Sequence, residues 1–421
     1  MTRCLLHGLS SLSALLGAVL VVLMSFPSMP VAAVAGSYSV LYEVRLDPAE
    51  RTAEVTIRLS HGADLVRRIE LRTKPGRYRH FSGDGSIEEV QGGVRWRPPK
   101  EGGALRYSFL IDHQRKRGGY DSYITETWAM MRGDDVVPPA RVRTRIGARA
   151  QARLRLELPP KWSAATPFPR DRDGDYRLED PGRRFLRPTG WLAFGRLGVL
   201  RERIGDTRVT VAGPVRQGLR RHDLLALLHW TLPTLEGLTG HLPERLLVVG
   251  AADPMWRGGL SGPRSLYLHA ARPLIANDGT SPLLHELMHT VMHARAGDGG
   301  DWIVEGLAQY YSLELLLRSG TISRPRYRKT LTGIERRGQA VGKLDVVAAT
   351  GAVTAHAVAV LHQLDRRLRK ETGGRAGLDD VLRAMIAAPQ PWTTASFRAV
   401  CERFSVGSLE GFFRHWVPQD P

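Results

Sequence analysis

Alternating hydrophobic and polar residues mark the first half of the chain as β-rich. The alternation has a period of two in residues 39–46 and 52–59, and Asp47 and Pro48 mark a turn between these segments. Such a period predicts strands that bury one face. Glycine and proline clusters separate further strand-like segments at 68–72, 93–97, 105–112 and 152–158. The pattern predicts an N-terminal β-sandwich domain over residues 36–205.

The second half changes to a mainly helical period. Residues 207–213 and 244–249 are strand-like, and residues 216–240 have a helical period that we expect to be broken near Pro233. Helices are then predicted at 323–337, 353–369, 378–388, 393–404 and 409–416. We therefore expect a second domain over residues 206–421, with a small sheet and several helices.

The first 35 residues have the composition of a secretory signal peptide. Arg3 gives a positive start, residues 12–24 are apolar, and the Ala-Val-Ala sequence at 33–35 resembles a cleavage site. An uncleaved anchor is the alternative, but the apolar run is short for a membrane span and two prolines follow it. We expect a secreted or periplasmic protein with no transmembrane span in the mature chain.

Composition and charge narrow the function classes. The 43% hydrophobic content is enough for a sizeable core. The net charge of +18 comes from scattered arginines without a nucleic-acid-binding motif, so we expect no nucleic-acid partner. Peripheral association with an anionic envelope surface remains open. Of the two cysteines, Cys4 leaves with the signal, so Cys401 forms no intramolecular disulfide.

One stretch carries the chemistry of a metal site. His285 and His289 are separated by one helical turn, in an H-E-x-x-H pattern that can direct two imidazoles at one zinc ion (Zn2+). Glu286, beside the first histidine, can act as a base without binding the metal. A glycine-rich turn follows, and Asp301 is expected to cap a second helix. That helix would bring Glu305 to the histidines as a third ligand, as catalytic zinc requires.

These residues carry a family resemblance. The H-E-x-x-H pattern followed by W-x-x-E-G-x-A-x-Y-Y at residues 302–311 resembles the gluzincin metallopeptidases. Within them it is most similar to the glycyl aminopeptidase family, and aminopeptidase N is a more distant relative. The resemblance covers roughly the last 170 residues and implies a thermolysin-like, mainly helical zinc peptidase domain. It also implies that Gly258, Gly259, Leu260 and Ser261 form an edge strand that pairs with an extended peptide substrate.

The chain departs from that family at two places. A glutamate that recognises the substrate's free amino group is replaced by Ser261. The transition-state tyrosine is missing near Val353 and Thr354, where His356 is the nearest residue able to donate a hydrogen bond to the oxyanion. A buried or interhelical histidine is the alternative interpretation of His356. Both departures place exopeptidase specificity in question.

The sequence therefore predicts a secreted zinc metallopeptidase of peptides or proteins, with Glu286 as general base. A zinc-binding pseudopeptidase that binds peptides or envelope components without cleaving them is the main alternative. The replaced glutamate and tyrosine favour that alternative, whereas the retained Glu286 opposes it. A third possibility is an envelope scaffold without a metal.

Overall fold

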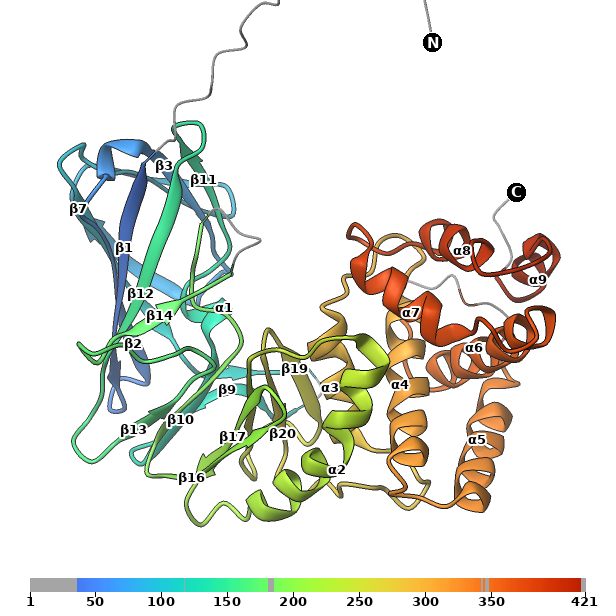
Figure 1. The fold of residues 1–421 in the computed structure, drawn as a ribbon. Coiled ribbons are helices and arrows are strands. Elements are labelled where there is room, and N and C mark those ends of the chain that lie inside the picture. The colour runs from blue at the N-terminus through green and yellow to red at the C-terminus, as the bar shows by residue number, and fades with distance from the viewer. Residues whose placement is uncertain (1–35, 117, 181–184, 342–343, 345–347, 418–421) are drawn as a thin grey trace, which may run out of the picture.

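The structure is a computed structural model of the 421-residue chain. It describes residues 36–116, 118–180, 185–341, 344 and 348–417. The predicted signal segment at 1–35, with Cys4, lies outside the described residues. The chain is a mixed α/β protein, with the strands of the first half at one end and helices α4 to α9 at the other (Figure 1).

Two sheets of the first half share one hydrophobic core. The six-stranded sheet has the order β14-β12-β1-β2-β7-β4, and the four-stranded sheet has the order β11-β3-β6-β5. Tyr42, Ile57 and Trp96 are among the core residues that the two sheets bury. The alternation predicts these strands correctly, since all six predicted segments overlap one. The bounds are β1 (Ser37–Asp47), β2 (Thr52–Leu59), β3 (Val66–Arg72), β4 (Tyr78–Gly83), β5 (Ser86–Val90), β6 (Gly93–Arg97), β7 (Gly103–Leu110), β11 (Ala140–Thr144), β12 (Arg149–Glu157) and β14 (Tyr176–Leu178), with a short 3-10 helix at Ala63–Leu65.

A third sheet, of order β13-β15-β10-β9-β8, was not predicted from the sequence. Its strands are short, and β15 and most of β10 are buried on both faces, so no alternation marks them. The short helix α1 (Gly133–Val136) follows β10 directly. The bounds are β8 (His113–Gln114), β9 (Tyr120–Ile124), β10 (Trp128–Arg132), β13 (Ser163–Ala165) and β15 (Trp191–Gly195).

A fourth sheet lies between the third sheet and the helices. Its order is β16-β17-β18-β20-β19, which leaves β19 at an edge. One face packs on the third sheet, where the rings of Trp191 and Tyr267 lie 5.1 Å apart. The expected domain boundary at residue 205 falls in the turn between β16 and β17, so β16 lies in this fourth sheet. The bounds are β16 (Leu197–Ile204), β17 (Thr207–Pro214), β18 (Arg245–Val249), β19 (Gly259–Gly262) and β20 (Ser265–Leu268).

Helix α2 (Arg221–Thr239) covers the other face of the fourth sheet and runs without a break through Pro233. The expected break near Pro233 is therefore wrong. Proline removes one backbone hydrogen bond and crowds the carbonyl of His229. Both residues are exposed, so water can satisfy that carbonyl, while Leu228, Leu232 and Leu235 on the opposite face are buried and hold the helix in place.

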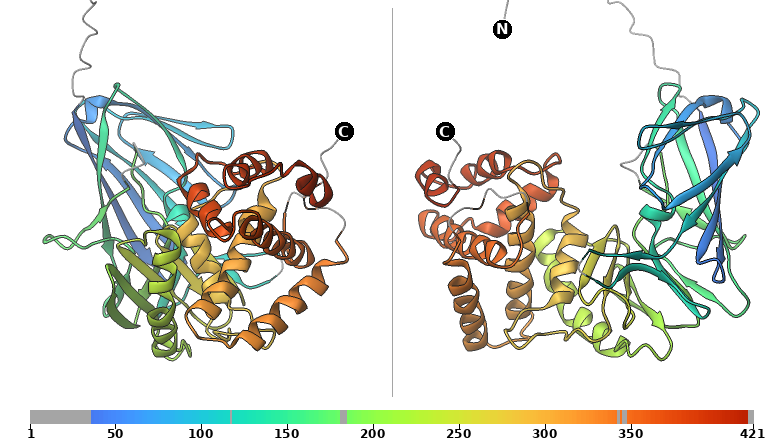
Figure 2. Two further views of the ribbon diagram at one scale, coloured as in Figure 1. Left: turned by 45° about the vertical axis from the view of Figure 1, so that its right-hand side comes forward. Right: turned by 180° about the vertical axis from the view of Figure 1, so that it is seen from behind.

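The rest of the chain is helical, as predicted, and the helices stack beside the fourth sheet (Figure 2). The bounds are α3 (Pro282–Met292), α4 (Asp301–Arg318), α5 (Arg324–Gly338), α6 (Ala352–Glu371), α7 (Leu378–Ala387), α8 (Thr394–Glu402) and α9 (Glu410–Trp416). Cys401 is buried in α8. No helix in the described part of the chain has the length and apolar character needed to cross a membrane.

Candidate metal site

Helix α3 carries the H-E-x-x-H pattern and has defined ends. The hydroxyl of Ser281 accepts a hydrogen bond from the N–H of Leu284, and Pro282 occupies the first helical position, where its missing N–H is harmless. The helix ends at Met292, and its C-cap His293 has a left-handed φ of 49° and is exposed. His293 lies outside the group of candidate metal-ligating residues described below.

Helix α4 follows after a glycine-rich turn. Its N-cap is Gly300 rather than the predicted Asp301, which is the first helical residue. The Asp301 carboxylate instead accepts a hydrogen bond from the N–H of Ala349, in the segment that leads to α6. The aspartate thus connects the start of α4 to a distant part of the chain, which local capping preferences do not predict.

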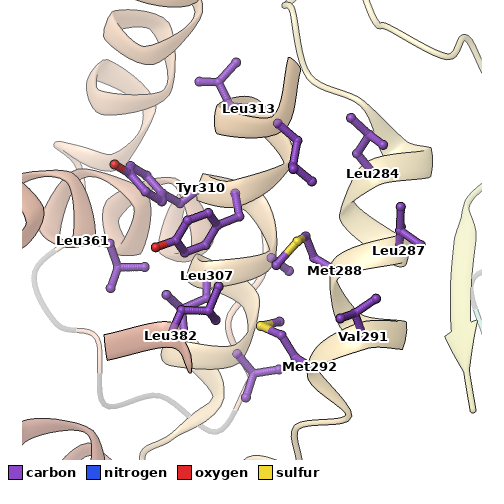
Figure 3. Packing of buried hydrophobic residues seen from close by; sticks show 14 of the residues in the cluster. Leu284, Leu287, Met288, Val291, Met292, Leu307, Tyr310, Leu313, Leu361 and Leu382 are labelled. Carbon is purple, nitrogen blue, oxygen red and sulfur yellow. The ribbon is translucent and has the colours of Figure 1, made fainter. Parts of the chain in front are cut away.

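The two helices share one core that holds the metal-ligating face in position. Figure 3 shows Met288 and Met292 of α3 on the side that faces α4. Together with Leu307 of α4 they are buried in the large core of the second half. Such close packing resists displacement of the side chains next to it. The polar residues at 285, 289 and 305 are therefore carried on two helices whose relative position is fixed.

The structure brings His285, His289 and Glu305 together. The two Nε2 atoms are 3.1 Å apart, and each lies 3.4 Å from one oxygen of the Glu305 carboxylate. A tetrahedral zinc ion with bonds of about 2.0–2.1 Å separates its ligand atoms by roughly 3.3 Å. The three distances match that requirement, and the set of two imidazoles and one carboxylate suits zinc. This is the only such group among the described residues.

The electrostatics of the three groups also favour a cation. Burial raises the pKa of Glu305, but its hydrogen bonds with His285 and His289 outweigh this and bring the pKa to about 2. Burial lowers the pKa of His289, but Glu305 and, more weakly, Glu286 raise it above its ordinary value. The carboxylates therefore stabilise positive charge between the imidazoles, whether a proton or a metal ion supplies it.

Glu286 lies directly beneath the edge strand β19. A Cβ atom added to Gly259 would come within 2.5 Å of the Glu286 Cγ and 2.9 Å of its Oε1. The absence of a side chain at Gly259 therefore allows the strand to approach the carboxylate closely. Within the described chain, no ion pair or hydrogen bond engages the Glu286 carboxylate, which leaves it able to accept a proton.

The predicted substrate-binding residues form this edge. Gly259, Leu260 and Ser261 lie in β19, and Gly258 precedes it. Side chains of the third sheet contact the strand: the indole N–H of Trp191 donates to the Leu260 carbonyl at 2.8 Å, and Arg132 donates to the Ser261 carbonyl at 3.1 Å. Neither contact is predictable from the sequence, because they connect residues 69 and 129 positions apart and no local pattern marks them.

A cleft of about 700 Å³ opens beside the three metal-ligating residues. Its lining includes His285, Glu305 and, from α6, Thr354. The Thr354 hydroxyl donates to the Ala349 carbonyl at 3.2 Å. Residues of α3, α4, α5 and α6 all contribute to the lining of the cleft.

His356 does not lie at this cleft. Its ring packs against Trp416 with centroids 5.5 Å apart, and it lines a separate groove between α5, α6 and α9. Burial lowers its pKa. Successive helical residues are turned by about 100°, so α6 directs Thr354 and Ala355 at the cleft and His356 away from it. The predicted oxyanion role of His356 therefore conflicts with its position.

Comparisons with known proteins identify the fold. No protein-family model and no curated protein matches the chain. Among solved structures, an aminopeptidase N family protein from Idiomarina loihiensis aligns with a TM-score of 0.70 and 14% identity, over 91% of this chain and 76% of that one. An M1 zinc metallopeptidase from Deinococcus radiodurans aligns with a TM-score of 0.58 and 18% identity, and a point mutant of it with 0.60 and 17%, each over 92% of this chain and 95% of that one. At these identities the likeness shows a shared fold.

Proposed function

We propose that the protein is a secreted zinc metallopeptidase that hydrolyses peptide bonds. The observation that carries the proposal is the tetrahedral spacing of the His285, His289 and Glu305 ligand atoms. Zinc held by these residues would polarise the scissile carbonyl and lower the pKa of a water molecule. The fold shared with M1 zinc metallopeptidases supports this function. We infer that the second half is the thermolysin-like domain that the sequence resembles.

The positions of the other residues support the roles that we propose for them. Glu286 accepts the proton of the attacking water and passes it to the leaving amine, because its carboxylate lies beside the metal-ligating set and has no other partner in the described chain. An extended peptide adds to the outer edge of β19, with its scissile bond near Gly259 and Glu286. The mature chain would act on peptides or proteins outside the cytoplasm, with no nucleic-acid partner. The proposal that the protein is secreted rests on the composition of residues 1–35.

A zinc-binding pseudopeptidase remains the second candidate. The observation that favours it is the position of His356, which leaves the cleft without the predicted donor to an oxyanion. The Thr354 hydroxyl is engaged with the Ala349 carbonyl. Such a protein would bind peptides along β19 and leave them intact.

A cleavage assay on the purified mature chain distinguishes the two candidates. Elemental analysis should find about one zinc per chain, and zinc should be lost from the His289→Ala variant. Mass spectrometry of a random peptide mixture should show hydrolysis that a chelator abolishes and added zinc restores. Bound but intact peptides would establish the pseudopeptidase. A parent without zinc, or a His289→Ala variant that binds zinc as tightly as the parent, would overturn the ligand set.

A further inference from the structure

The outer edge of β19 presents only part of its backbone. β19 is antiparallel to β20, and the N–H of His269 donates to the carbonyl of Gly258. Hydrogen-bonded residues alternate along an antiparallel strand. Gly258 and Leu260 therefore face the neighbouring strand, whereas Gly259 and Ser261 direct their N–H and C=O groups outward. A peptide that extends the sheet meets Gly259 and Ser261.

Arg132 already donates a hydrogen bond to one of these outward backbone groups. Its Nη1 donates to the Ser261 carbonyl at 3.1 Å, and its guanidinium carbon lies 5.9 Å from the centre of the Trp191 ring. Arg132 is the last residue of β10 and pairs with Trp191 across the third sheet. The Ser261 carbonyl thus accepts a hydrogen bond from a side chain, whereas no side chain of the described residues donates to the Gly259 carbonyl.

The charge of Arg132 is only partly neutralised. Its nearest carboxylate is that of Asp134, at 3.7 Å. The same carboxylate lies 3.4 Å from Arg187 and accepts the N–H of Gly190 at 2.8 Å. The Asp134 carboxylate is therefore shared between two guanidinium groups and a backbone N–H, and it does not neutralise Arg132 alone. The Arg132 side chain is 30% exposed, so a ligand can reach it.

The separation of Arg132 and Glu286 along β19 determines which residues of a bound peptide Arg132 can reach. Glu286 lies at Gly259, and Ser261 is two residues further along the strand. Two residues of a β-strand span roughly 7 Å. A guanidinium at Ser261 is therefore near the side chain or terminus of a peptide residue within about two positions of the bond at Glu286.

We propose that Arg132 determines substrate specificity, selecting peptides that carry a carboxylate within two residues of the bond at Glu286. A carboxylate can form paired, charge-assisted hydrogen bonds with the guanidinium. A free α-ammonium or a lysine at the same position is repelled. Preference at a cleaved bond rests on the proposed peptidase function, whereas charge preference in binding does not depend on it.

Binding measured by calorimetry tests this proposal directly. The protein is the zinc-loaded Glu286→Gln variant, so that peptides stay intact. The probes are alanine hexapeptides, acetylated and amidated at their ends, in which each position in turn carries Glu, Gln or Lys. At one or two positions we expect the Glu peptide to bind about tenfold more tightly than the Gln peptide, and the Lys peptide to bind most weakly. The difference should shrink at high salt.

Two substitutions of Arg132 distinguish the effect of its positive charge from the effect of its hydrogen bond to the Ser261 carbonyl. Arg132→Gln keeps an amide donor for the Ser261 carbonyl and should abolish the preference, and Arg132→Glu should reverse it. Arg145→Gln is the control: it removes the same charge at a 60% exposed site beside Asp64 and should change nothing. Two results would overturn the proposal. One is equal affinity for all three peptides in the Glu286→Gln protein that retains Arg132, and the other is a preference that survives when Arg132→Gln is added.

The outcomes also separate this proposal from the peptidase function. If the Glu286-containing protein cleaves the same peptides without charge preference, the function stands and the role of Arg132 is wrong. If the peptides bind with the expected preference and none is cleaved, Arg132 selects ligands for a pseudopeptidase. If no peptide binds or is cleaved, both proposals are wrong.

Discussion

Gly259 offers a test of how closely β19 and Glu286 must approach each other. Gly259→Ala adds one methyl group, whose carbon would lie 2.5 Å from the Glu286 Cγ and 2.9 Å from its Oε1. Non-bonded carbon atoms prefer separations of about 3.5–4.0 Å. The strand or the glutamate side chain must therefore move by about 1 Å. The nearest contacts of the added methyl are all atoms of Glu286, so the metal-ligating residues should keep their positions.

The size of the effect follows from that displacement. Helix α3 is held by buried Leu287 and Met288, so most of the movement falls on the Glu286 side chain or on the edge strand. A displacement of about 1 Å at a reacting group can lower the rate by about a hundredfold. We therefore expect Gly259→Ala to retain about one zinc per chain and to lose about a hundredfold in kcat/KM.

The assay compares peptide hydrolysis, zinc content and unfolding in parent and variant. Gly237→Ala is a matched control, because Gly237 is an exposed residue of α2 with no atom within 4 Å of an added Cβ. It should keep full activity, with an equal or slightly higher stability. Full activity in Gly259→Ala would refute the close placement of Glu286 under β19. A loss of zinc would show that the substitution disturbs α3 itself.

Two further predictions concern stability and His356. Asp379→Asn removes charge from a cluster in which Asp379 accepts hydrogen bonds from Arg318 and Tyr311, and it should lower the free energy of unfolding by about 1–2 kcal/mol in denaturant titrations. The exposed Glu410→Gln variant is the control and should show little change. Burial raises the pKa of Asp379, but Arg318 lowers it below the ordinary value, so this stabilisation is complete above about pH 4 and should disappear as the pH falls further. His356→Ala should lower stability by about 0.5–1.5 kcal/mol through its lost contact with Trp416 and leave kcat unchanged, and a kcat decrease of a hundredfold in folded protein would restore its catalytic role.

The convergence of His285, His289 and Glu305 on two helices could be predicted because its determinants are local. His285 and His289 are fixed by helical spacing, and the glycine-rich turn limits where α4 can return. The alternating strands of the first half were predictable for the same reason, since each buries one face. The third sheet was not, because strands buried on both faces lack alternation. Helix α2 continues through Pro233 because burial of its leucines outweighs a local preference.

Tertiary contacts account for the remaining differences between the sequence predictions and the structure. Arg132 reaches Ser261 only because β10 of the third sheet lies against the edge of the fourth, and nothing near residue 132 in the sequence indicates this. His356 differs from its expected placement by a rotation about α6. The sequence places it within one turn of the expected position, but two residues along a helix change the direction of a side chain by about 200°. Asp301 was expected to cap α4 and instead contacts the segment before α6.

The central claim is that Glu286 acts as a base at a zinc site, and one comparison tests it most directly. Parent and Glu286→Gln proteins are each measured for zinc content, for peptide affinity and for single-turnover hydrolysis. The account predicts equal zinc, similar affinity and a rate at least about a hundredfold lower in the variant, because an amide cannot accept the proton. Equal hydrolysis rates in two proteins with equal zinc would contradict it.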